Sequence, residues 1–285
     1  MSDVPAHAAV LRRTELITPE PAEALAGVLD IEAPAGTLPP LWHWVYLLER
    51  RRESELGSDG HPTQGIPAPP GPDRLRMFAG GRVTALGSLR IGEPASRTTR
   101  VLRSVDKQGR SGRLTFVTVR SEIEQAGELV IIDEQDIVYR AAGSSLPPAT
   151  DSTRGAEVGA GDGEQSGCRL EFDVDPVLLF RFSALTYNAH RIHYDKDYAT
   201  AEGYPDLVVH GPLQALLMAE ALRRCVPMHG RPFVYRLVAP TYGAQRLTVT
   251  TKAGPDGAEA RVRDGAGSLT ATGVVAATAT LPAAQ

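Results

Sequence analysis

The sequence has little cysteine, no long apolar run and no excess of basic charge. Two cysteines, Cys168 and Cys225, among 285 residues cannot form a disulfide framework, which predicts a reducing compartment, the cytoplasm. No stretch approaches the roughly 18 apolar residues of a membrane span. Residues 1–10 lack a basic cluster followed by an apolar core, so we expect no secretory signal. The 30 basic and 34 acidic side chains give a net charge of −4, which argues against nucleic acid or an anionic membrane as partner.

The remaining composition is that of a globular protein, with 42% hydrophobic and 22% charged residues. The length predicts about two domains. Residues 143–167 have no aromatic side chain and few large aliphatic ones, so they cannot bury enough apolar surface to offset their ordering entropy. We therefore predict a flexible linker at 143–167 between an N-terminal domain at 1–142 and a C-terminal domain at 168–285.

Both halves have the order of a helix followed by strands. In the first half we predict a helix at 21–29, an apolar segment at 41–48, a Pro/Gly-rich loop at 57–72, and strands at 82–91, 96–105, 114–123 and 128–139. In the second half we predict a strand pair at 168–174 and 177–183, a polar loop at 185–205, a buried helix after Pro212, and strands at 233–238, 244–252, 259–263 and 269–279. The pattern predicts an α+β fold in which sheets wrap helices.

Reactive side chains are concentrated in one segment, F-S-A-L-T-Y-N-A-H-R-I-H-Y-D at 182–195. His210-Gly211-Pro212 follows at the start of the predicted buried helix. A helix N-terminus offers free N–H groups and a positive dipole end, and a glycine there lets a ligand approach the backbone. Such an N–H can stabilise an oxyanion that forms on a carbonyl. The sequence thus places acid/base candidates and an oxyanion-binding candidate on neighbouring segments.

This segment, followed by V-V-H-G-P-L at 208–213, resembles the active-site signature of the MaoC-like dehydratases, the (R)-specific enoyl-CoA hydratase family. The resemblance implies a hot-dog fold, an antiparallel sheet wrapped round a central helix. Three further segments resemble the N-terminal domain of double hot-dog members: P-P-L-W-H-W at 39–44, M-F-A-G-G at 77–81 and E-Q-D-I-V-Y-R at 134–140. Together they are similar to the group that hydrates mesaconyl-C4-CoA and itaconyl-CoA, with an N-terminal half that shapes the substrate tunnel.

The resemblance also implies roles for individual residues. Asn188 occupies the position of the family's acidic residue, and because an amide cannot accept a proton we expect it to position the water molecule. His193 is expected to act as general base in hydration and as acid in the reverse direction, and the Gly211 N–H to receive the thioester oxygen. The resemblance places five further residues near the substrate: Arg191, which is expected to pair with a free carboxylate, and His190, His210, Trp42 and His43.

Several alternatives remain open at this point. His190 and His193, with Asp195 and His210, could form a metal site, although we expect neither metal nor cofactor because the thioester itself acidifies the α-carbon. Trp42 and His43 could be core residues instead of a wall for the acyl or pantetheine arm. The function could also be that of a 3-hydroxyacyl-thioester dehydratase in fatty-acid or polyketide synthesis. A third alternative is a non-catalytic acyl-CoA-binding subunit, and the fold allows a homodimer.

Overall fold

The computed structural model describes residues 9–70, 74–109, 112–141, 167–255 and 257–276. The first half contains β1 (Leu11–Leu16), α1 (Glu20–Leu29), two short 3-10 helices at Trp42–Val45 and Glu53–Glu55, β2 (Arg74–Ala85), β3 (Pro94–Gly109), β4 (Gly112–Gln125) and β5 (Glu128–Ala141). The second half contains β6 (Arg169–Val174), α2 (Pro176–Leu185), a 3-10 helix at Arg191–His193, α3 (Lys196–Ala201), α4 (Gly211–Leu222), β7 (Pro232–Leu237), β8 (Gln245–Gly254), β9 (Gly257–Arg263) and β10 (Leu269–Ala276).

The strands form one ten-stranded antiparallel sheet in the order β1-β3-β4-β5-β2-β7-β10-β9-β8-β6. The two halves are joined where β2 pairs with β7, with Gly81 opposite Tyr235. Gly80 lies beside a bulge in β2 at a φ of +153°, and a Cβ there would lie 2.4 Å from the Tyr235 carbonyl oxygen. Glycine is required at this position because only a backbone without Cβ can approach its neighbour so closely.

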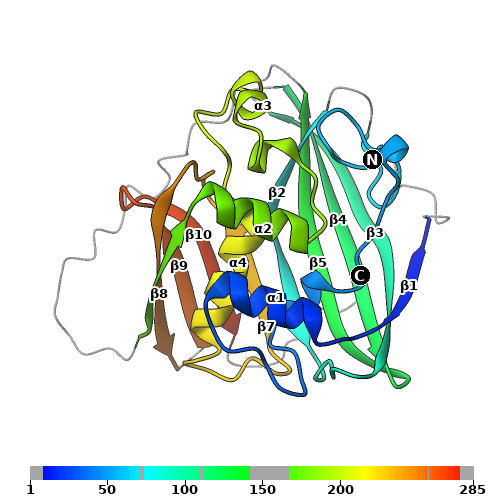
Figure 1. Ribbon diagram of the computed structural model, residues 1–285, viewed down its shortest axis with the longest axis vertical. Coiled ribbons are helices and arrows are strands. Elements are labelled where there is room, and N and C mark those ends of the chain that lie inside the picture. Colours follow the sequence, from blue (N-terminus) through cyan, green and yellow to red (C-terminus); the bar gives the residue numbers. More distant parts are fainter. Residues whose placement is uncertain (1–8, 71–73, 110–111, 142–166, 256, 277–285) are drawn as a thin grey trace.

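Helices α1, α2 and α4 lie together on one side of the curved sheet (Figure 1). Helix α4 is buried on every side, from Leu213 through Leu222, and packs against β8, β9 and β10. Its polar side chains have partners: Glu220 accepts a hydrogen bond from Trp42 Nε1 at 2.7 Å, and Gln214 accepts one from the Thr270 hydroxyl at 2.7 Å. The predicted buried helix and the predicted α+β architecture are confirmed.

Residues 176–185 form helix α2, so the predicted strand at 177–183 is wrong. Asp175 caps the helix by accepting a hydrogen bond from the Leu178 N–H at 2.7 Å, and Pro176 occupies the first turn, where its missing N–H has no cost. Leu179 and Phe182 are buried on one face. The run of apolar residues suggested a strand, but the cap and the helical spacing of the buried residues determine the helix.

Other boundaries also differ from the prediction. Strand β2 begins at Arg74 and ends at Ala85, instead of running from 82 to 91, because the N–H groups of Leu86 and Gly87 both turn to the Val130 carbonyl oxygen. Gly80 and Gly81 therefore lie within a strand rather than in a turn before it. Strand β1 and helix α3 were not predicted. The predicted linker falls, except for Gly167, outside the described residues, and its role and the domain boundaries stay predictions.

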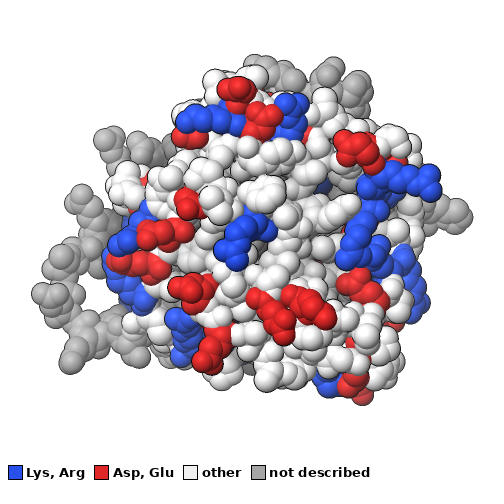
Figure 2. All heavy atoms as spheres, in the orientation of Figure 1, with Lys and Arg blue, Asp and Glu red and all other residues white. Residues whose placement is uncertain are grey.

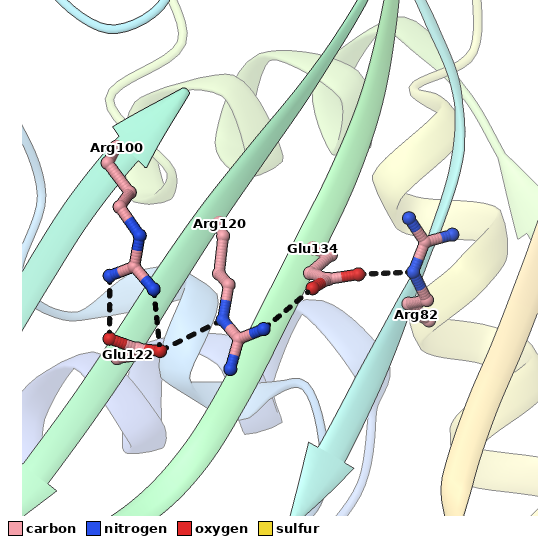
Figure 3. A network of polar contacts seen from close by, with 5 residues as sticks. All are labelled: Arg82, Arg100, Arg120, Glu122 and Glu134. Carbon is pink, nitrogen blue, oxygen red and sulfur yellow. Dashed lines mark hydrogen bonds and ion pairs between the residues drawn. The ribbon is translucent and has the colours of Figure 1, made fainter. Parts of the chain in front are cut away.

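A ladder of alternating charges crosses four strands of the first half (Figure 3). Arg100 on β3 holds Glu122 with contacts of 2.8 and 3.0 Å, and Arg120 on β4 bridges Glu122 at 2.9 Å and Glu134 at 3.2 Å. Arg82 on β2 binds the other oxygen of Glu134. Because neighbouring Val83 points into the core and side chains alternate along a strand, this ladder lies on the face of the sheet away from the helices.

Acidic and basic side chains are interspersed over the face drawn in Figure 2, without a large field of one sign. On that face the described residues form no basic patch or stripe of the kind by which a nucleic-acid-binding face is recognised. Among the described residues, no helix is long and apolar enough to cross a bilayer.

Candidate active site

His193 ends the short turn of 3-10 helix at Arg191–His193, and a fixed hydrogen bond sets its tautomer. Its Nδ1 lies 2.7 Å from the Val208 carbonyl oxygen, and a carbonyl only accepts, so Nδ1–H is the donor. The Val208 N–H in turn donates to the Ile192 carbonyl at 2.9 Å, which ties the two segments together. The neutral ring therefore carries its lone pair on Nε2, for which the described residues provide no hydrogen-bond partner. This is the arrangement of a general base.

His193 belongs to a row of four imidazoles, which we call the imidazole row: His61, His190, His193 and His210. The rings of His193 and His210 stack with centroids 3.7 Å apart, while His190 meets His193 edge-on at 5.5 Å and His61 lies 4.0 Å from His190. Ser183 contacts His210 Nε2 at one end, 2.8 Å away. Three segments distant in sequence thus meet at one place.

Burial keeps the imidazole row uncharged. It lowers the pKa of His193 to about 4, an effect that the Val208 hydrogen bond opposes and the nearby His61 reinforces. Burial likewise lowers the pKa of His61, and brings those of His190 and His210 well below the usual value for histidine. At neutral pH His193 is therefore in the basic form that can accept a proton.

Gly211 presents a backbone donor beside this base. It is the first residue of α4, and its N–H has no acceptor among the described residues. It directly follows His210, whose ring stacks on His193. A Cβ at this position would lie 3.1 Å from Phe78 Cδ1 and 3.2 Å from Leu237 Cγ, so the glycine lets three elements converge. His193 and Gly211 are thus neighbours in the fold, and their roles as base and oxyanion donor stay predictions.

Asn188 supports the His190 backbone: its Oδ1 accepts the His190 N–H at 3.1 Å, which leaves that oxygen one more lone pair. Arg191 points its guanidinium to Asp195, with Nε at 3.0 Å and Nη2 at 2.6 Å from one carboxylate oxygen. Its remaining Nη1 donates to the Ser58 carbonyl at 3.2 Å. Asn188 is thus next to the row, whereas the Arg191 guanidinium is occupied by protein groups, and its substrate role stays a prediction.

Trp42 and His43 lie apart from the imidazole row. Trp42 is bound to Glu220, nine residues along α4 from Gly211, which is about 14 Å at the helical rise per residue. His43 Nε2 lies 3.1 Å from Asp133 Oδ2, and both residues are buried. Both side chains therefore occupy positions in the core, which was the alternative interpretation of Trp42 and His43. Their contact with substrate stays a prediction.

Asp59 and His61 of the first half also lie at this site, although no pattern in the sequence indicated them. His61 Nδ1 is 3.0 Å from Asp59 Oδ2, and the Asp59 carbonyl accepts the Arg191 N–H at 2.9 Å. The local signal is only the short string S-D-G-H at 58–61 within a Pro/Gly-rich loop. Such strings are common in turns. Only the contact between the two halves distinguishes this string from an ordinary turn.

The four-residue metal alternative of the sequence does not form one cluster. Among the described residues, the single group of three possible ligands within 4.8 Å consists of Asp59, His61 and His190. Asp59 and His61 are already hydrogen-bonded to each other. The ring of His61 also packs on that of His190, with centroids 4.0 Å apart and an interplanar angle of 41°. We therefore interpret the group as a hydrogen-bonded Asp–His pair that packs on His190.

Gly60→Ala is expected to disrupt this contact between the halves. Gly60 has a φ of +87°, and a Cβ there would lie 1.8 Å from the Ala189 carbonyl oxygen, so the loop must move away from His190. We expect kcat/KM to fall at least tenfold, since a 1 Å misplacement can cost about 100-fold. As a matched control, Gly92→Ala has a similar φ of +90° and open space around it. Equal kinetics for the two variants would contradict this expectation.

Comparisons with known proteins agree with this fold. Residues 41–243 match the family model for hydroxyacyl-thioester dehydratase type 2. The chain is 43% identical over 268 residues to mesaconyl-C(4)-CoA hydratase of Chloroflexus aurantiacus, covering 88% of this chain and 90% of that protein. It is 25% identical over 252 residues to the mitochondrial hydroxyacyl-thioester dehydratase type 2 of Schizosaccharomyces pombe, covering 78% and 80% of the two chains.

Solved structures show the same architecture. HtdX of Mycobacterium tuberculosis aligns over 94% of this chain and 99% of its own, with a TM-score of 0.67 and 14% identity. A conserved hypothetical protein of the same organism, described as a double hot-dog fold, aligns over 94% and 96% with a TM-score of 0.57 and 14% identity.

The double hot-dog fold, with a buried neutral histidine beside a free helix N-terminus, agrees with the match to a family of enzymes that act on thioesters. This chain belongs to the MaoC-like, hydroxyacyl-thioester dehydratase type 2 family. It is an enoyl-thioester hydratase, a hydro-lyase, as the resemblance of its 182–213 segment implied.

Proposed function

We propose that the substrate is a short branched dicarboxylic acid bound to CoA, namely mesaconyl-C4-CoA or its isomer itaconyl-CoA. The observation that carries the proposal is the 43% identity, over 88% of the chain, to the mesaconyl-C(4)-CoA hydratase of Chloroflexus aurantiacus. The neutral imidazole row and the free Gly211 N–H supply what hydration of such a thioester needs.

The proposed hydration begins at His193. Its Nε2 takes a proton from a water molecule, and the hydroxide oxygen forms a bond to the β-carbon of the enoyl thioester. The π electrons move toward the thioester oxygen, where the Gly211 N–H meets the growing negative charge. An oxyanion donor of this kind contributes roughly 3–4 kcal/mol to transition-state stabilisation. Asn188 holds the water through its remaining lone pair.

The second step returns the proton. The His193 imidazolium donates it to the α-carbon, the thioester carbonyl reforms, and the base is restored. Because burial lowers the pKa of His193 to about 4, its imidazolium is a stronger acid than an exposed one, which favours this transfer. Dehydration follows the same path in reverse, so one histidine serves both directions.

A substrate panel tests the proposal. Purified protein is incubated with mesaconyl-C4-CoA, itaconyl-CoA, crotonyl-CoA and a crotonyl-acyl-carrier protein, and hydration products are measured by chromatography. We expect kcat/KM to be at least tenfold higher for a dicarboxylyl-CoA than for crotonyl-CoA. A preference for crotonyl thioesters would refute the dicarboxylate assignment, whereas no turnover of any of them would point to an acyl-CoA-binding subunit.

The second candidate is dehydration of 3-hydroxyacyl thioesters in fatty-acid or polyketide synthesis. The match to the hydroxyacyl-thioester dehydratase type 2 family over residues 41–243 favours it. It shares the imidazole row and the Gly211 donor, so the two candidates differ only in the acyl group and its carrier. Higher kcat/KM on the acyl-carrier-protein substrate than on every CoA thioester would select this alternative.

A further inference from the structure

The geometry points to Arg76 as the residue that binds the free carboxylate of the substrate. This inference rests on the proposed function and extends it by assigning the receptor for the charged end of the acyl group. Four observations carry it. They are a cavity, an unpaired guanidinium in its wall, the position of that side chain relative to the imidazole row, and its distance along β2 from Phe78, which lies beside Gly211.

The cavity lies next to the imidazole row on the side of the first half. It has a volume of about 140 Å³, and seven of its lining residues are polar: Glu49, Asp59, His61, Gln64, Arg74, Arg76 and Tyr139. His61 both lines the cavity and packs on His190, with ring centroids 4.0 Å apart. A group inside the cavity is therefore separated from His190 by a single ring.

Arg76 is the charge in this wall that lacks a partner. Glu49 is paired with Arg51, Asp59 is hydrogen-bonded to His61, and Arg74 donates to the Arg113 carbonyl at 3.2 Å. For Arg76 the described part of the chain provides neither an ion pair nor a hydrogen bond. A half-buried guanidinium without a carboxylate has five donors available for an anion.

The positive charge of Arg76 acts on the row itself. It is one of the causes, after burial, that lower the pKa of His61 and His190. The same charge stabilises the anionic form of Tyr139, which lies directly opposite Arg76 on β5. The guanidinium, which lines the cavity, is therefore also within electrostatic range of His61, His190 and Tyr139.

Strand β2 relates Arg76 to the reaction centre. Arg76 and Phe78 are two residues apart, before the bulge that follows Phe78, so they share one face of the strand with Cα atoms about 6.5 Å apart. Phe78 contacts the Gly211 position, where a Cβ would be 3.1 Å from its ring. An acyl chain with its thioester oxygen at the Gly211 N–H would extend past Phe78 toward Arg76.

The substrate has dimensions that suit this path. In a four-carbon dicarboxylic monothioester the carboxyl carbon is three bonds from the thioester carbonyl carbon, roughly 4 Å away in the extended form, and a guanidinium adds several ångströms of reach. The carboxylate is attached to the β-carbon that receives the hydroxide, so its receptor also orients that carbon toward His193. Arginine binds a carboxylate through two parallel hydrogen bonds, which fixes its orientation as well as its position.

The test compares ligands that differ only in the carboxylate. Direct binding is measured by calorimetry with succinyl-CoA and butyryl-CoA, which are saturated and do not react. Turnover is measured with mesaconyl-C4-CoA and with 3-methylcrotonyl-CoA, in which a methyl group replaces the carboxylate. We expect Arg76→Gln to lower affinity for succinyl-CoA, and kcat/KM for mesaconyl-C4-CoA, by about 100-fold. Values for the two uncharged ligands should stay within about threefold of the wild-type protein.

Arg103→Gln is the control, because Arg103 is an exposed arginine on β3 that does not line the cavity. It should keep the wild-type preference for succinyl-CoA. If Arg76→Gln does not fold, Arg76→Lys carries the test: a single ammonium group in place of the fork should reduce the preference about tenfold. A wild-type preference in the folded Arg76 variant, or an equal loss for charged and uncharged ligands, would overturn the inference.

The two proposals fail differently. The wild-type protein could prefer succinyl-CoA in a way that depends on Arg76, yet fail to hydrate mesaconyl-C4-CoA. That result would refute the proposed substrate and support Arg76 as the carboxylate receptor. Alternatively, the wild-type protein and Arg76→Gln could hydrate mesaconyl-C4-CoA with the same selectivity over 3-methylcrotonyl-CoA. That result would support the proposed substrate and refute Arg76 as the receptor.

Discussion

Replacement of His193 by alanine is expected to lower kcat about 1000-fold or more on every thioester that the wild-type protein hydrates. General base catalysis contributes typically 10²- to 10⁴-fold. The Nδ1–H donation to Val208 fixes the position of His193 Nε2, and no other imidazole would occupy that position in the variant. The measurement is steady-state hydration, followed as loss of the conjugated thioester. His193 is buried, but it lies at the end of a short 3-10 helix and not within the main hydrophobic core. We therefore expect the melting temperature to change by only a few degrees.

His229→Ala is a suitable control for this variant. His229 is exposed, beyond the end of α4 farthest from Gly211, and its removal should leave kcat unchanged. Circular dichroism of both variants shows whether the fold is kept. A near-wild-type hydration rate in a folded His193→Ala protein would remove the basis of the proposed mechanism.

The second large effect is a loss of stability in mild acid. The four histidines of the imidazole row all have a pKa below the usual value of about 6.5 because they are buried. Below pH 6.5 the unfolded chain binds protons at these residues, whereas the folded protein does not until the pH reaches the folded-state pKa, about 4 for His193. The free energy of unfolding therefore decreases as the pH falls.

The expected size of this loss is about 1 kcal/mol per histidine between pH 7 and pH 5.5, hence several kcal/mol for the whole row. Urea unfolding at constant ionic strength measures it. Most carboxylates stay ionised in this window, so the histidines dominate the slope. His210→Asn, which removes one buried imidazole, should show a smaller pH dependence than the wild type. A free energy of unfolding that is constant from pH 7 to pH 5.5 would contradict the neutral row.

Much of the site could be predicted from the sequence because it is local. Asn188, His190 and His193 lie within six positions, and the helix that begins at Gly211 is marked by Pro212 and a continuous apolar run. Hydrophobic periodicity and helix-start signals report such short-range order well. The same signals misassigned 177–183, since a short apolar run does not distinguish a strand from a buried helix, and the Asp175 cap with Pro176 was the discriminating feature.

The sequence by itself predicted the α+β class, and its 182–213 segment was enough to single out His193 and Gly211 as candidates for the base and the backbone donor, because each depends on residues close together in the chain. Only the tertiary structure brought Asp59, His61 and Arg76 to the same place, more than 100 residues before His190. Their position depends on the pairing of β2 with β7 and on the contact of Gly60 with the Ala189 carbonyl. Such pairings join the two halves through backbone register and close approach, which leave no periodic pattern in either segment alone.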